Sequence, residues 1–197
     1  MTEALFGFIG VIVGSLIPWF KDTLENRRSR KEFATYLAVR VICLLDEFAE
    51  NCVDVVQDDG TAEGRPARTT ESGECYCVPQ VPLPIVPNFP EDLDWRSIET
   101  GLMYRILSLP DAVRRCDRYI SASSEHAYPP DYEEVFEARQ LGYAQLGLEA
   151  LEIAGCLRTS YGLPKEVGNQ WHFGWDAKEF FEERIRKFDT EKTVANV

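Results

Sequence analysis

The sequence has few of the residues on which metal sites and many enzyme sites depend. Only two histidines and two methionines occur among its 197 residues. A helical bundle that binds two metals carries Glu-x-x-His on two helices, but Ser123 and Asn169 stand three residues before the two histidines. The chain also has no phosphate-binding loop, no dinucleotide fingerprint and no G-x-S-x-G motif. We therefore expect no metal and no cofactor, and the sequence favours a non-enzymatic protein.

Basic residues are scarce relative to acidic ones. The chain has 21 Lys and Arg against 33 Asp and Glu, which gives a formal net charge of −12. Residues 1–31 contain five basic and three acidic groups, so the remaining 166 residues contain 16 basic and 30 acidic groups, a net charge of −14. Because nucleic-acid binding requires a basic face, this balance argues against a nucleic-acid partner and predicts a strongly acidic body.

The six cysteines form no recognisable metal or disulfide framework. Cys75 and Cys77 are the only close pair, and their single intervening residue differs from the two to four residues typical of a structural zinc site. We interpret them as loop thiols that could form a disulfide. The other four lie in apolar helical patterns, where cysteine behaves as a small hydrophobic residue.

One long uncharged run is present near the N-terminus. It extends for 17 residues from Ala4 to Phe20 and ends before Lys21. As a helix it would be about 25 Å long, slightly shorter than a hydrocarbon core of about 30 Å. The run lacks the basic start and small-residue cleavage site of a signal peptide. We predict an uncleaved transmembrane anchor over 1–21, with a buried core helix or an interfacial helix as the alternative.

A basic collar, residues 22–31, follows the predicted anchor. The basic residues beside the run all lie on its C-terminal side: Lys21, Arg27, Arg28, Arg30 and Lys31. The positive-inside rule then predicts a single-pass membrane protein with the N-terminus outside and the body in the cytoplasm. In that arrangement these five residues would contact the anionic surface of the bilayer.

Three glycines lie on one stripe of the predicted anchor. Gly7, Gly10 and Gly14 have offsets of three and four residues, and the last two form a GxxxG pair. Small residues in this pattern allow two membrane helices to approach closely. The stripe predicts packing of the anchor into a homo-oligomer. Because glycine is common in membrane helices, the alternative is an anchor that does not self-associate.

The body, residues 32–188, has the pattern of a helical bundle. Apolar residues recur every three or four positions from Glu32 to Gln57, and further helices are expected to start at Asp94, Pro110, Asp131 and Asp176. Residues 58–93 form a long Gly- and Pro-rich loop, which we expect to cross the helices as an extended strap. Residues 189–197 form a flexible tail. The predicted fold is all-α, a single transmembrane helix followed by an antiparallel helical bundle.

An aromatic-rich segment precedes the last predicted helix. Trp171, His172 and Trp175 lie within five residues of one another and form a candidate pocket or interaction loop. Our leading interpretation is a membrane-anchored, non-enzymatic protein whose acidic cytoplasmic domain mediates protein–protein interaction or assembly. One alternative is a homo-oligomeric membrane effector, pore-like or envelope-perturbing. Another is an unrecognised enzyme that uses the loop 171–175. The expected partners are the lipid bilayer and a protein of unknown identity.

Overall fold

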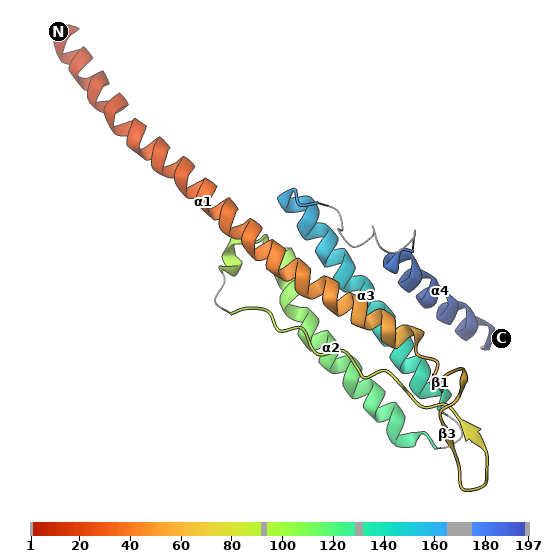
Figure 1. Ribbon diagram of the computed structural model, residues 1–197. Helices are drawn as coiled ribbons and strands as arrows, with labels where there is room; N and C mark the ends of the chain where they lie inside the picture. The colour runs from red at the N-terminus through yellow and green to blue at the C-terminus, as the bar shows by residue number, and fades with distance from the viewer. Residues whose placement is uncertain (1, 92–93, 129–131, 165–174, 196–197) are drawn as a thin grey trace.

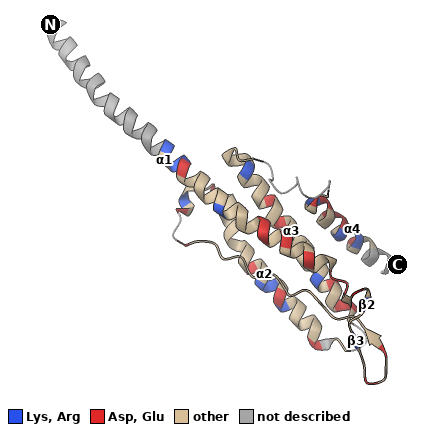
Figure 2. Cartoon of the chain, in the orientation of Figure 1, with Lys and Arg blue, Asp and Glu red and all other residues tan. Residues whose placement is uncertain are grey.

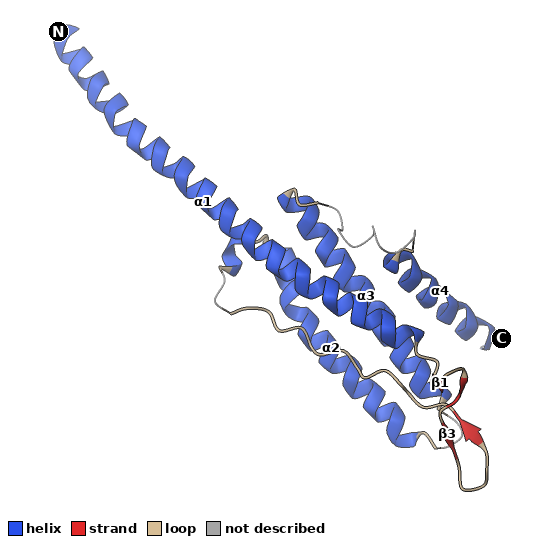
Figure 3. Cartoon of the chain, viewed as in Figure 1, coloured by secondary structure: helices blue, strands red, loops and turns tan. Residues whose placement is uncertain are grey.

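Helices account for most of the structure, a computed structural model that describes residues 2–91, 94–128, 132–164 and 175–195 (Figure 3). Side chains are described for all of these except 2–27, 126 and 191–195. The helices in this part of the chain are α1 (Thr2–Gln57), the short 3₁₀ helix η1 (Trp95–Ser97), α2 (Thr100–His126), α3 (Glu133–Tyr161) and α4 (Ala177–Ala195).

Helix α3 lies at the centre and is antiparallel to each of the other three α-helices (Figure 1). Against α1, the ion pairs Asp46–Arg158 and Asp58–Arg139 fix this direction, because the residue number rises in one helix as it falls in the other. Two contacts of α3 with α2 and two with α4 show the same opposite order of residue numbers. Consequently α1, α2 and α4 run parallel to one another, which differs from a simple up-down bundle.

The long loop predicted at 58–93 carries the chain from the end of α1 back to the start of α2 (Figure 1). It begins with two small antiparallel pairs of strands. Strand β1 (Thr61–Ala62) pairs with β2 (Arg65–Pro66), and β3 (Arg68–Thr69) pairs with β4 (Cys75–Tyr76). The chain then runs in extended form along the helices. Its return over the length of the bundle is the reason why α1 and α2 are parallel.

Apolar side chains of this extended segment pack on the helices, as the sequence predicted. Phe89 is buried, and Val81, Leu83 and Val86 pack against the core. Ile85 differs, since 89% of its surface is exposed. The ring of Phe89 meets Trp95 of η1 edge-on, with 6.2 Å between ring centroids. The segment therefore closes one side of the bundle.

The core is formed by the faces that α1, α2 and α3 turn toward one another. In the described part of α1 the buried positions begin at Ala34 and recur every three or four residues to Val56, as expected for an amphipathic helix. The largest fully buried side chains are Tyr143, Phe181, Leu37, Leu45, Ile106, Leu109, Ile153 and Leu157. Phe181 brings α4 into this core against Gly147 of α3.

The prediction of a single-pass membrane protein is wrong. Among the described residues, no helix has both the length and the apolar character needed to cross a membrane. Instead of a separate anchor over 1–21, the structure has one continuous helix, α1, that passes through the uncharged run, the charged collar and the bundle. This finding corrects the predicted fold class and the predicted membrane localisation, and with them the assigned orientation of the two ends. The mostly helical character of the body is as predicted.

Pro110 does not end a helix, although the sequence predicted a new helix there. It lies inside α2, which continues to His126. Proline removes one backbone hydrogen bond in a helix, but Leu109 and Val113 on either side are buried. Core packing on both sides of the proline therefore maintains the helix.

Candidate interaction surfaces

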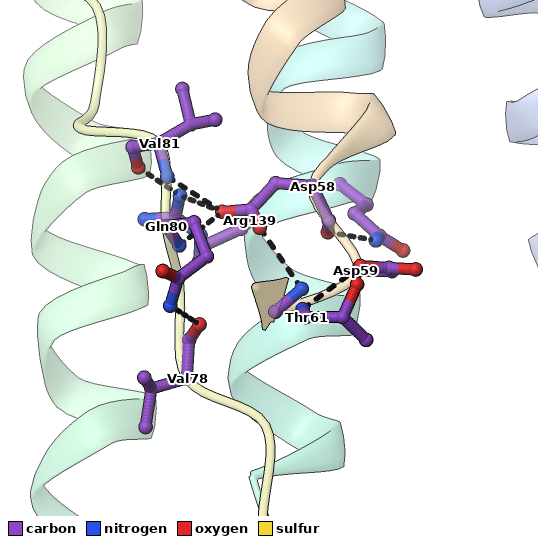
Figure 4. Close-up of polar contacts among 9 residues, drawn as sticks. Asp58, Asp59, Thr61, Val78, Gln80, Val81 and Arg139 are labelled. Atoms are coloured by element: carbon purple, nitrogen blue, oxygen red, sulfur yellow. Dashed lines mark hydrogen bonds and ion pairs between the residues drawn. The ribbon is translucent and has the colours of Figure 1, made fainter. Parts of the chain in front are cut away.

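The most enclosed polar cluster of the described chain surrounds Asp58, at the end of α1 (Figure 4). One carboxylate oxygen accepts a hydrogen bond from the Gly60 amide at 2.9 Å. The other accepts from the amides of Gln80 and Val81 at 2.9 and 3.0 Å and from Nη2 of Arg139 at 3.2 Å. The carboxylate therefore joins α1, the extended segment and α3.

Arg139 completes the cluster from α3. Its Nη2 also donates to the carbonyl of Val81 at 2.6 Å. The side chains of Arg139 and Asp58 are only 7% and 2% exposed. Burial lowers the pKa of Arg139, and the adjacent Asp58 carboxylate opposes that shift. Because desolvation of a buried pair offsets much of its Coulomb energy, we interpret the pair as fixing the position of the extended segment.

Gln140 extends the cluster to the last helix. Its side-chain amide donates to the Asp58 carbonyl at 2.8 Å, and its oxygen accepts from Nη2 of Arg184 on α4. The Nε atoms of Arg139 and Arg184 are buried without a hydrogen-bond partner. None of these residues was predicted from the sequence to belong to a site. A signal was available, because Arg139 continues the apolar stripe of Val135 and Tyr143 at four-residue spacing.

A groove of about 720 Å³ opens between α2 and α3, with Phe188 of α4 also lining it. On α3 the lining residues recur every three or four positions from Glu134 to Leu146, so they form one stripe of that helix. The small and apolar lining residues are Ala112, Cys116, Ala138, Leu141, Gly142 and Leu146. A Cβ at Gly142 would collide with Sγ of Cys116, so the two backbones come very close at this point.

The polar residues of the groove differ between its two sides. Arg115, Tyr119 and Ser123 come from α2, whereas Glu134 and Glu137 come from α3. The guanidinium of Arg115 already lies 2.6 Å from Asp111. Tyr119 is 66% exposed, so its ring is accessible at the edge of the groove. The groove thus combines an apolar lining with two exposed carboxylates.

Cys116 is a poor nucleophile for any reaction in the groove. Burial, together with the nearby Asp117 carboxylate, raises the pKa of its thiol to about 11. The reactive form of cysteine is the thiolate, which this thiol does not populate at neutral pH. The neighbouring Tyr143 hydroxyl donates to Asp117 at 2.5 Å, and burial raises its pKa as well. These two groups therefore serve in packing and hydrogen bonding.

The outer face of α1 presents apolar side chains where the helix enters the bundle. Phe33, Tyr36 and Val39 are 62%, 56% and 42% exposed. The guanidinium of Arg40 lies over the ring of Tyr36, 5.8 Å from its centroid. We call Phe33, Tyr36 and Val39 the α1 patch. Further along α1 the exposed residues include Glu47, Glu50 and Asp54.

Three of the predicted collar residues have described side chains, and all three are exposed on α1. Arg28 forms an ion pair with Glu32 at 3.2 Å. Arg30 donates to the carbonyl of Arg96 at 2.8 Å and so connects α1 to η1. Lys31 accepts, through its backbone carbonyl, a hydrogen bond from the Thr35 hydroxyl. The side chains of Lys21 and Arg27 lie outside the described residues.

The other predicted site residues are described only in part. For Gly7, Gly10 and Gly14 the structure gives the helical backbone, and their packing lies outside what it describes. Trp171 and His172 also lie outside the described residues. The ring of Trp175 packs against that of Phe180 at an angle of 46°, with 5.7 Å between ring centroids. This contact is a hydrophobic staple at the start of α4, so the described part of the aromatic segment has a structural explanation.

Comparison with known proteins identifies no relative. No protein-family model, no curated protein and no solved structure matches the chain. In the described part of the chain, no group of three or more His, Cys, Asp or Glu residues is arranged to hold a metal ion. A functional proposal must therefore be based on the exposed surfaces of the described chain.

Proposed function

We propose that the protein acts by binding another protein, and that the α1 patch is a principal contact surface. The observation that carries this proposal is the exposure of Phe33, Tyr36 and Val39 on a helix whose opposite face is already fully packed. Clustered exposed apolar residues on a folded protein are typical of interaction sites. Aromatic side chains are also enriched among the residues that contribute most to interface affinity.

The surroundings of the patch favour a partner with an apolar centre and basic groups beside it. Arg40 lies within the patch against Tyr36, but the exposed positions that follow on α1 include Glu47, Glu50 and Asp54. A partner that covers the patch and extends along α1 would meet these carboxylates. Charge complementarity of this kind increases the association rate and favours the correct partner.

The proposal can be tested by replacing Phe33 and Tyr36 with Glu in the full-length chain. A protein that co-purifies in fixed stoichiometry with the tagged wild-type chain from its native cells should be lost from the double variant. The matched control replaces Tyr104 and Leu107 with Glu, because these are also exposed apolar residues, but on α2. Equal loss from the control, or no stoichiometric partner of the wild-type chain, would contradict the proposal.

A further inference from the structure

The groove between α2 and α3 has the dimensions and lining of a site for one more helix. Its lining on α3 extends from Glu134 to Leu146, which corresponds to about 18 Å at 1.5 Å per residue. That length matches about three turns of a docked helix. An amphipathic helix that places its apolar face in such a groove is a recurrent mode of protein recognition.

The other faces of α3 are already covered by helices. Helix α1 reaches it through Arg139 and Arg158, α2 through Glu149, and α4 through Gln140 and Gly147. The residues that line the groove form the remaining stripe along the first half of α3. A helix docked there would complete the set of neighbours around this central helix.

The chain itself contains a helical segment with suitable chemistry that projects from its own bundle. The N-terminal part of α1 projects far beyond the other helices (Figure 1). Its sequence has the 17 uncharged residues Ala4–Phe20, followed by the basic residues from Lys21 onward. Because α1 is one continuous helix that points away from its own groove, only the groove of another copy is accessible to it.

We infer that the projecting part of α1 docks in the α2–α3 groove of a second copy of this chain. The uncharged run covers the apolar lining around Leu141 and Leu146, and the basic residues Lys21 and Arg27 lie beside Glu134 and Glu137. This order makes the docked helix antiparallel to α3, like the other three helices. The contact is heterologous, so it closes into a dimer when it is reciprocal and extends into a chain of copies otherwise.

The charge pattern of the molecule supports this occupant. The segment 1–31 carries a net positive charge, whereas residues 32–197 carry a net charge of −14. Lys and Arg in the described part of α1 gather where this helix leaves the bundle, and Asp and Glu are spread over the helices of the bundle (Figure 2). Association of one copy's N-terminal segment with another copy's bundle therefore joins opposite charges. This inference uses the groove, whereas the proposed function uses the α1 patch.

The test measures self-association of the full-length chain by sedimentation at several protein concentrations in low salt. The wild-type chain should show a mass above that of the monomer, which increases with concentration. The groove variant Glu134→Lys/Glu137→Lys should associate at least tenfold more weakly. The matched control Glu179→Lys/Glu182→Lys has the same charge change and spacing on exposed positions of α4 and should associate like the wild type.

Exchange of the charges between the groove and the collar identifies the segment that occupies the groove. The collar variant Lys21→Glu/Arg27→Glu should also associate weakly, and the chain that carries all four groove and collar substitutions should recover association. Tyr119→Ser in the groove should weaken association, whereas Tyr104→Ser near the start of α2, outside the groove lining, should not. Circular dichroism of each variant confirms that the bundle remains folded.

Four results would overturn the inference. The first is a monomeric wild-type chain at every concentration, and the second is equal behaviour of the groove variant and its control. The third is failure of the four-substitution chain to recover association. Flotation of the monomeric chain with phosphatidylcholine vesicles would likewise overturn it, since the projecting helix would then have a different occupant. None of these results depends on Phe33 or Tyr36, so the proposed function is tested separately.

Discussion

At the Asp58 carboxylate, hydrogen bonds from three backbone amides and from Arg139 meet in a site that is almost closed to solvent. The pair Arg115–Asp111 has a shorter contact, 2.6 Å, but its side chains are 59% and 57% exposed. Exposed pairs gain little because water screens them. Removal of one partner of a buried pair leaves a charge without solvent or counter-charge. Burial, more than distance, therefore decides which ion pair matters for folding.

We expect Asp58→Ala to lower the free energy of unfolding by about 3–5 kcal/mol, because Arg139 and three backbone amides lose their partner. Asp111→Ala should lower it by less than about 1 kcal/mol. Urea denaturation of both variants measures the two values. Similar losses for the two variants would show that the Asp58 cluster does not hold the extended segment in place.

Gly60 illustrates a residue whose role the sequence suggested only in part. The run Asp58-Asp59-Gly60 indicated the end of a helix, and Gly60 does have a φ of +74°, which favours glycine. The structure adds a second constraint, because a Cβ at this position would collide with Phe136 of α3. Local patterns indicate a turn, but they do not reveal which distant side chain packs against it.

At the level of the element, the period of apolar residues was a reliable guide to helices, whereas proline was not. The helices expected from Glu32 and Asp176 are present, and Asp176 caps α4 through the amides of Lys178 and Glu179. The break expected at Pro110 is absent. Packing of Leu109 and Val113 outweighs the lost backbone hydrogen bond, and that packing depends on other helices. Helix boundaries at prolines thus require tertiary information.

Helix α2 has a strong cap that predicts a pH dependence. The Glu99 carboxylate accepts from the amides of Gly101 and Leu102, both at 2.8 Å, and these bonds lower the pKa of Glu99 below its usual 4.5. A lowered pKa in the folded state contributes stability that is present above the unfolded pKa. That stability is lost as the pH falls through the folded pKa.

Glu99→Ala should therefore lower the melting temperature at pH 7, and its difference from the wild type should shrink as the pH falls below 4.5. Thermal unfolding by circular dichroism between pH 3 and pH 7 measures this difference. The control Glu125→Ala removes an exposed carboxylate near the other end of α2, where a negative charge is unfavourable to the helix dipole. A difference that stays constant with pH would exclude the charged cap as its cause.

At the level of the whole molecule, the sequence predicted that the helices exist but not how they are arranged. The sequence predicted the loop 58–93 and its packing across the helices, but not that the loop returns over the length of the bundle and makes α1 and α2 parallel (Figure 1). The candidate surfaces depend on this arrangement. The groove exists only because α2 and α3 are adjacent, and the Asp58 cluster joins residues up to 82 positions apart. Separations of this size leave no periodic trace in a sequence.

The same architecture divides α1 into a part that folds the bundle and a part that does not. Among the side chains of α1 that the structure describes, burial begins at Ala34, and the first tertiary hydrogen bond along the helix is that of Arg30 to the carbonyl of Arg96. A chain that begins at Arg28 should therefore unfold cooperatively, with a melting temperature within about 4 °C of the full chain when both are monomeric, which corresponds to less than about 1 kcal/mol. A chain that begins at Val39 lacks the buried side chains of Ala34, Leu37 and Ala38. Its free energy of unfolding should fall by about 3 kcal/mol or more. Equal melting temperatures of these two shortened chains would show that the core begins further along α1.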